Sequence, residues 1–127
     1  MAVHVTIDVN QKVVVSTYYG EINDDDLFHV VSLIRSHPDF DPSFSDLMDL
    51  SGVTAGTFST SALYQKSQQE SIFDLESMHV MIAPQPHIFG LARMTQVFAA
   101  KKKPNTAVVQ TIDEARKFLK LEKTSSA

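Results

Sequence analysis

Apolar and polar residues alternate in two segments near the start of the chain. From Val3 to Val9 every second residue is apolar, and Val13 to Tyr19 is again rich in β-branched and aromatic residues. This pattern is typical of strands, and the short polar turn between the segments predicts an antiparallel hairpin that ends at Gly20. The polar residues of the hairpin predict one solvent-facing side, made by His4, Thr6, Asp8 and Ser16.

A helix is predicted directly after the hairpin. Asn23 is a good N-cap, and the next three residues, 24–26, are aspartates that suit the positive end of a helix better than they indicate a metal site. The helix should end near His37, because Pro38 disfavours helical geometry in the residue before it. Its apolar stripe, at the spacing that packs a helix on a sheet, consists of Leu27, Val30, Val31 and Ile34.

Two further helices are predicted in the middle of the chain. Ser59 or Thr60 can cap a helix over about 60–73, and its polar middle should face water. The segment 88–99 has helical spacing and is apolar around most of its circumference. We therefore expect it to be buried by more than the sheet alone.

Three segments between the helices are predicted strands: 45–50, 78–83 and 107–109. The first two carry apolar residues on both sides, which favours interior parallel strands. In the first, Leu47 and Asp49 share one face. The last strand precedes a helix for which Thr111 and Glu114 supply a capping box.

The predicted fold is α/β, with the element order β-β-α-β-α-β-α-β-α. An antiparallel hairpin leads into a mostly parallel five-stranded sheet with about four helices, right-handed crossovers and connections between neighbouring strands. If each crossover steps the same way, the helices collect on one face of the sheet. We expect residues 1–121 to form a single domain and 122–127 to be a polar C-terminal tail.

Composition excludes several classes of protein. The chain has no cysteine, so thiolate chemistry, disulfides and cysteine-based metal sites are excluded. The net charge is −4, and the only basic run is Lys101–Lys103. Nucleic-acid binding is therefore not expected, because neutralising phosphates takes a basic face and not one short run. Without a long apolar run or a signal-peptide pattern, the chain should not insert stably in a membrane, and we expect a cytoplasmic protein.

Three short motifs carry a family resemblance. Residues 49–54, Asp-Leu-Ser-Gly-Val-Thr, resemble the signature loop of the STAS domain family, the anti-sigma-factor antagonists, and the predicted element order is also that of the SpoIIAA-like fold. Residues 40–42 and 89–94 are similar to a group of uncharacterised bacterial proteins described as SpoIIAA-like or STAS/SEC14-like. Antagonists of the family place a phosphorylated Asp-Ser pair at the next helix start, and residues 54–61 lack that pair. The resemblance thus implies the fold without its phosphoswitch.

The candidate site lies in the loops at the carboxyl ends of the parallel strands, where open α/β sheets bind ligands. The residues predicted to bind a ligand or partner there are Ser51, Gly52, Thr54, Thr57, Ser59, His87 and Arg93. The alternative is that the hydroxyls simply cap helices. No catalytic residue, metal site or cofactor is predicted. We therefore predict a non-enzymatic regulatory or interaction module that binds a protein partner or a small ligand.

Other interpretations remain open. The apolar third helix could complete the core, which is the favoured interpretation, line a pocket, as in a carrier of lipid or another small apolar ligand, or form a homodimer surface. Its Arg93 should reach water or a carboxylate. His79 could hydrogen-bond Asp49 on the neighbouring strand in a structural pair. A hydrolase acting through Ser51, His79 and His87 is the least favoured, because the G-x-S-x-G context is missing.

Overall fold

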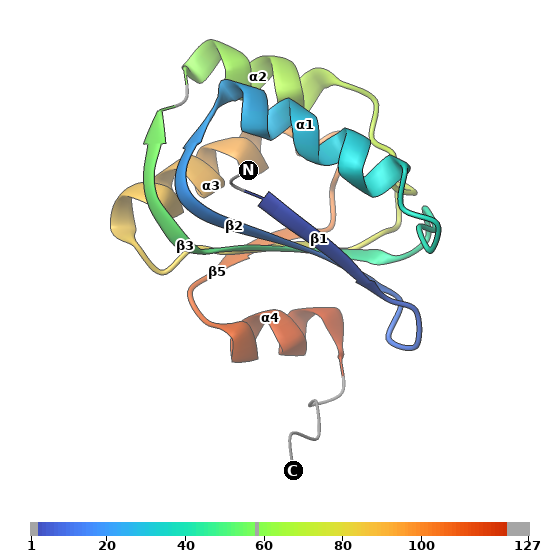
Figure 1. Ribbon diagram of the computed structural model, residues 1–127. Coiled ribbons are helices and arrows are strands. Elements are labelled where there is room, and N and C mark those ends of the chain that lie inside the picture. Colours follow the sequence, from blue (N-terminus) through green and yellow to red (C-terminus); the bar gives the residue numbers. More distant parts are fainter. Residues whose placement is uncertain (1–2, 58, 122–127) are drawn as a thin grey trace.

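The computed structural model describes residues 3–57 and 59–121, which form an α/β sandwich (Figure 1). The predicted tail, 122–127, lies outside the described residues. The strands are β1 (Val3–Asp8), β2 (Val13–Asn23), β3 (Ser45–Thr57), β4 (His79–Ile82) and β5 (Thr106–Val109). The helices are α1 (Asp24–Arg35), α2 (Thr60–Gln68), α3 (Pro86–Phe98) and α4 (Ile112–Leu119).

The five strands form one sheet in the sequential order β1-β2-β3-β4-β5. β1 and β2 pair antiparallel, with Val3 opposite Tyr18 and Asp8 opposite Val13. The pairs β2–β3, β3–β4 and β4–β5 are all parallel. The predicted hairpin, parallel sheet and connections between neighbouring strands are therefore confirmed.

The helices cover both faces of the sheet, so the expectation that all of them collect on one face is wrong. α1, α2 and α3 lie on one face and α4 lies on the other (Figure 1). Ala115 and Leu119 of α4 pack with Val13, Leu47 and Val80 in a second apolar cluster. The inner strands are apolar on both faces, and each apolar face requires a covering layer.

The side of the hairpin assigned to water also needs correction at Ser16. His4 and Thr6 of β1 are exposed as predicted, but Ser16 is fully buried on the face that α1–α3 cover. Its neighbours on that face of β2 are Val14 and Tyr18, which belong to the main core. Ser16 is thus a polar residue within an apolar face.

β2 and β3 run further than the sequence predicts. β2 continues past Gly20 to Asn23, and most of the predicted loop from Ser51 belongs to β3, whose end faces Asn23; Phe58 lies outside the described residues. Irregular register on either side of Gly20, whose φ is +71°, allows the pairing to continue. A Cβ at Gly52 would lie 3.1 Å from the Tyr18 carbonyl oxygen, which explains a small residue there.

The helix starts follow the local capping signals. Asn23 and Asp26 form a capping box for α1, and Ser59 and Thr111 accept the capping N–H groups of α2 and α4. α1 ends at Arg35, close to the predicted end. α2 is much shorter than the predicted 60–73, because the polar residues after Gln68 form no further turn of the helix.

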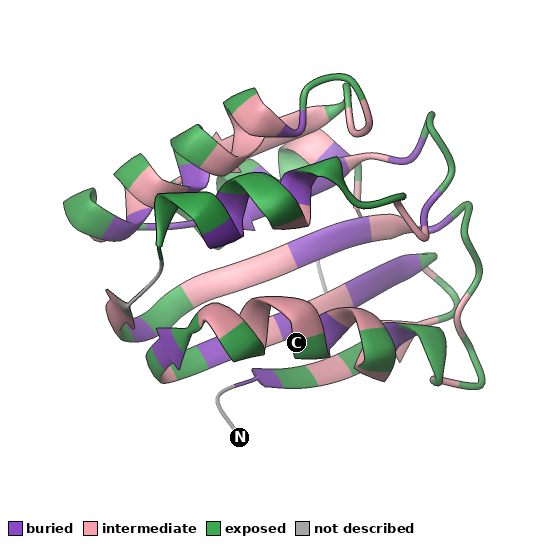
Figure 2. Cartoon of the chain, turned by 90° about the horizontal axis from the view of Figure 1, so that it is seen from above, coloured by how far each residue is buried: buried purple, intermediate pink, exposed green. Residues whose placement is uncertain are grey.

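α3 is less buried than its apolar sequence predicts. Ile88 and Ala92 face the core, whereas Met94 is exposed and Val97 is 69% exposed. Exposed and buried residues alternate along the helices in Figure 2, so each helix shows one face to solvent. The expectation that more than the sheet buries α3 is confirmed, because α2 also packs against it, with Tyr64 edge-on to Phe98. The homodimer through this helix stays a prediction.

Candidate functional site

The residues predicted to form a strand-end site are engaged in local structure. The Ser51 hydroxyl and amide donate to Asp49 Oδ1 at 2.6 and 2.9 Å, and the Ser51 carbonyl accepts from Gln85 Nε2 at 2.8 Å. Ser59 caps α2, and its hydroxyl also donates to Asp24 Oδ2 at 3.2 Å. These contacts tie Ser51 to the start of α3 and Ser59 to the start of α1.

The same residues do not converge on one point. Ser51 and Thr57 lie on one extended strand, and six residue steps along a strand cover up to about 20 Å. Thr54 and Gly52 are exposed between them, and the side chain of Thr57 is not described. The hydroxyls therefore follow the strand and do not surround a small ligand.

His87 and Arg93 are both exposed on α3. Within the described residues, no carboxylate lies within ion-pair distance of Arg93. Its guanidinium therefore reaches water, which was one of the two predicted outcomes for this side chain. His87 lies in the first turn of α3, beside Gln85, the N-cap residue. Neither residue lines the cavity between the sheet and the helices.

A cavity of about 140 Å³ lies between the sheet and the layer of α1, α2 and α3. Its walls are mainly apolar and come from all three helices and from the inner strands. Representative wall residues are Val30 and Ile34 of α1, Leu63 of α2, Leu91 of α3, Met48 of β3 and Met81 of β4. The cavity therefore borders the main core, and it reaches the surface where the exposed residues Gln69 and Glu70 line it.

A buried histidine–aspartate hydrogen bond lies in the cavity wall at the amino ends of β3 and β4. His79 Nδ1 is 3.0 Å from Asp46 Oδ2, and the two residues are neighbours in the parallel register. His79 is 1% exposed and Asp46 is 3% exposed, and the ring of Phe73 packs edge-on against the imidazole. The prediction that Asp49 holds His79 is wrong, because Asp49 accepts from Ser51 and pairs in register with Ile82.

Two buried polar atoms of the cavity wall have no hydrogen-bond partner among the described residues. They are Asp46 Oδ1 and Ser16 Oγ. The Ser16 hydroxyl is near enough to the Tyr18 phenol to lower the pKa of that phenol, but the two groups do not meet in hydrogen-bond geometry. Burial is the larger influence, and together with the charge of Asp46 it raises the pKa of Tyr18, so the phenol keeps its proton.

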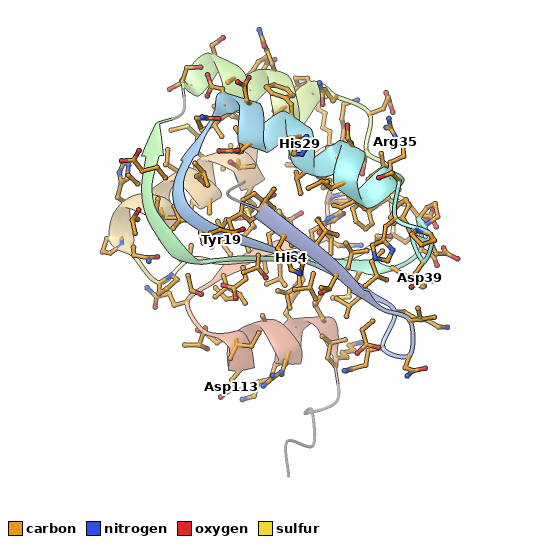
Figure 3. All side chains as sticks on the ribbon, viewed as in Figure 1. His4, Tyr19, His29, Arg35, Asp39 and Asp113 are labelled. Carbon is orange, nitrogen blue, oxygen red and sulfur yellow. The ribbon has the colours of Figure 1, made fainter. Side chains whose placement is uncertain are left out.

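Two lysines face the same region. Lys66 is partly buried in the last turn of α2, and Lys103 follows the end of α3; both line the cavity. Burial, helped by the positive charge of Lys103, lowers the pKa of Lys66 to about 8, and Asp46 opposes this shift. Other charged side chains lie outside, such as Arg35 on α1 and Asp113 on α4 (Figure 3).

The cavity is thus amphipathic, with apolar walls and one polar end. That end offers an unpaired carboxylate oxygen, a hydroxyl and two ammonium groups, which together can bind a ligand that both donates and accepts hydrogen bonds. Within residues 3–57 and 59–121, no cluster of His, Asp and Glu side chains could hold a metal ion. The chemistry available is recognition by hydrogen bonds, charge and apolar contact.

This site lies at the opposite ends of the strands from the predicted one. Ser16, Asp46, Lys66 and Lys103 were not predicted to take part in it, and His79 was assigned to a different carboxylate. The sequence does hold a signal for two of them, because Ser16 and Asp46 are polar residues on strand faces whose other residues are apolar.

An antiparallel hairpin that leads into parallel strands in sequential order, with helices on both faces, defines a SpoIIAA-like α/β fold. The chain is similar to the crystal structure of an uncharacterised protein of the DUF3478 family from Shewanella loihica PV-4, which has a SpoIIAA-like fold. The similarity covers 93% of this chain and 92% of that chain, with a TM-score of 0.57 and 14% sequence identity. The predicted fold is therefore confirmed.

No protein-family model and no curated protein matches the sequence. Within the described part of the chain, no helix is both long and apolar enough to cross a membrane.

Proposed function

We propose that the protein is a binding module for a small amphipathic molecule, which it holds in the cavity between the sheet and the helices α1–α3. The observation that carries this proposal is the presence of Asp46 Oδ1 and Ser16 Oγ, buried and unpartnered, in the wall of an apolar cavity. Buried polar groups are almost always hydrogen-bonded, so two such atoms at one cavity favour a missing partner.

The size of the cavity sets the class of ligand. A cavity of about 140 Å³ is comparable to apolar cavities of roughly 150 Å³ that bind benzene. Ligands of that size bind in roughly the micromolar to millimolar range, because few atoms contribute contacts. We therefore propose a metabolite with a short apolar part and one polar end, and not a full-length lipid.

The polar end of the ligand would complete the hydrogen bonds of the cavity. A hydroxyl or amide N–H can donate to Asp46 Oδ1, and Ser16 Oγ can donate or accept. Restoring partners to such atoms recovers a desolvation penalty of about 1–3 kcal/mol each. In this proposal the Asp46–His79 pair positions the acceptor oxygen and does not react with the ligand.

Among the functions that the sequence left open, the cavity favours the carrier of a small apolar ligand. The role of the strand-end residues in binding a protein partner stays a prediction that rests on composition and family resemblance.

The proposal is tested by titrating the protein with hexan-1-ol, hexanamide and phenol, followed by NMR. Ala92 lines the cavity from α3, so Ala92→Leu should fill part of it and abolish or strongly weaken binding. Ala100→Leu is the matched control, because Ala100 is exposed after the end of α3. The proposal is wrong if none of the three compounds binds, which would leave water as the only occupant, or if Ala92→Leu and Ala100→Leu bind them equally.

A further inference from the structure

Six titratable side chains line the cavity, and among the described residues neither of its two lysines has a carboxylate within ion-pair distance. They are Tyr18, Asp46, Lys66, Glu70, His79 and Lys103. Asp46 is paired with His79, and Glu70 is bonded to Lys102 at 3.2 Å on the outside. Lys66 and Lys103 are left to share the influence of one carboxylate that already has a partner.

Lys66 is the more informative of the two lysines, because it is partly buried in the last turn of α2. No carboxylate of the described residues lies within ion-pair distance of its ammonium group. Beyond the effect of burial, the positive charge of Lys103 lowers the pKa of Lys66 more than the negative charge of Asp46 raises it. The carbonyls at the end of α2 offset part of this cost, but a helix terminus contributes only about 0.3–1 kcal/mol to a neighbouring charge.

A partly buried cation that lines the same cavity as a second cation is an arrangement that a bound anion would stabilise. Charged groups that lose water are normally paired, and hydrogen bonds between ionised partners are about twice as strong as neutral ones. Resting on the proposed function, we infer that the ligand is an organic monoanion, such as a short carboxylate, whose charged group lies between Lys66 and Lys103. Its apolar part then lies against the walls formed by α1 and α3.

The arrangement also predicts how Asp46 and Ser16 take part. Asp46 would repel a second carboxylate in direct contact, so the anionic group lies on the lysine side of the polar end. A donor on the ligand or a bridging water then reaches Asp46 Oδ1. The ligand class is therefore a monoanion with a short apolar chain, and a cation of the same chain length is rejected.

The experiment compares three probes with the same chain: hexanoate, hexan-1-ol and hexylammonium. The affinities of the wild-type protein and of Lys66→Met are measured by calorimetry at neutral pH. We expect hexanoate to bind the wild-type protein best and to bind Lys66→Met roughly tenfold to a hundredfold more weakly. Hexan-1-ol should bind both proteins about equally, because it does not need the charge.

Two control variants separate charge from folding. Lys66→Arg keeps the positive charge and should retain the preference for hexanoate. Lys101→Met makes the same charge change at an exposed position of the basic run that contains Lys103, and it should leave all affinities unchanged. Unfolding by urea identifies any variant that fails to fold, and Lys103→Met then replaces Lys66→Met in the comparison.

The possible failures are distinguishable. Equal affinities for hexanoate and hexan-1-ol, or equal losses in Lys66→Met and Lys101→Met, would overturn the inferred charge and leave the proposed function intact. A protein that binds none of the three probes contradicts both. Raising the pH should weaken hexanoate binding as Lys66 loses its proton and leave hexan-1-ol unaffected, and the opposite trend would also overturn the inference.

Discussion

Replacing Ser16 by alanine should stabilise the ligand-free protein, although most substitutions of buried residues destabilise. Ser16 is 0% exposed, and its hydroxyl has no hydrogen-bond partner among the described residues. Removing an unsatisfied hydroxyl relieves a desolvation penalty of about 1–3 kcal/mol. The slightly larger cavity costs about 0.3 kcal/mol, taking about 24 cal/mol for each Å³ and roughly the volume of one oxygen atom. We expect a net gain of about 1 kcal/mol.

Ser77 provides a matched control, because it is also buried. Its hydroxyl donates to the Pro42 carbonyl oxygen at 2.8 Å, and Ser77 does not line the cavity. Ser77→Ala loses this hydrogen bond and should cost about 0.5–1.5 kcal/mol. The two serine-to-alanine changes should therefore have opposite signs.

Urea unfolding measures both effects. With a slope of about 1–3 kcal/mol/M for a small domain, a gain of about 1 kcal/mol raises the midpoint by about 0.3–1 M. Ser16→Ala should raise the midpoint and at the same time weaken binding of hexan-1-ol, since a functional polar group is retained at a cost in stability. If Ser16→Ala lowers the midpoint as Ser77→Ala does, the Ser16 hydroxyl is satisfied in the folded protein and the argument for a missing ligand loses its basis.

Three further results are expected. His79→Ala should destabilise by about 3–5 kcal/mol in urea unfolding, because it leaves the buried Asp46 carboxylate without its partner; a loss below about 1 kcal/mol would show that the pair is not formed. Burial lowers the pKa of Lys66 to about 8 in the folded protein from its ordinary value of 10.5. The unfolded chain therefore binds this proton more tightly, and the free energy of unfolding should rise with pH above about 8. Urea midpoints at about pH 7.5 and 9.5 should show this rise in the wild-type protein and a smaller one in Lys66→Met, and equal rises would contradict it. Asn23→Ala should cost about 0.5–2 kcal/mol by removing the capping box of α1, and circular dichroism during thermal unfolding would detect no shift if the cap were unimportant.

Local signals in the sequence predicted the starts of the helices well. Asn23, Ser59 and Thr111 each satisfy backbone N–H groups within three residues, so the information lies in adjacent positions. The extra length of β3 was not predictable in this way, because it depends on pairing with β2 across the irregular register at Gly20. The hydroxyl-rich segment from Ser51, which suggests a loop in the sequence, therefore forms part of β3 in the structure.

The candidate site depends on which face of its strand each residue occupies and on the register between strands, and a sequence specifies both poorly. Asp46 and Asp49 lie an odd number of residues apart, so they occupy opposite faces of β3, and only the register with β4 decides which of them meets His79. The polar sequence around Lys66 predicted a helix face in water, yet Lys66 is only partly exposed and lines the cavity together with residues of α3 and the sheet. A cavity between layers is a property of packing and has no local signature.

The most direct test of the account uses the methionine methyl groups as probes of ligand position. Met48 and Met81 line the cavity, Met78 packs in the apolar cluster with α4 on the other face of the sheet, and Met94 is exposed on α3. In NMR spectra of the protein labelled at these methyl groups, bound hexanoate or hexan-1-ol should give intermolecular nuclear Overhauser effects to Met48 and Met81 and none to Met78. Effects confined to Met94 or Met78 would place the ligand outside the cavity and contradict the account.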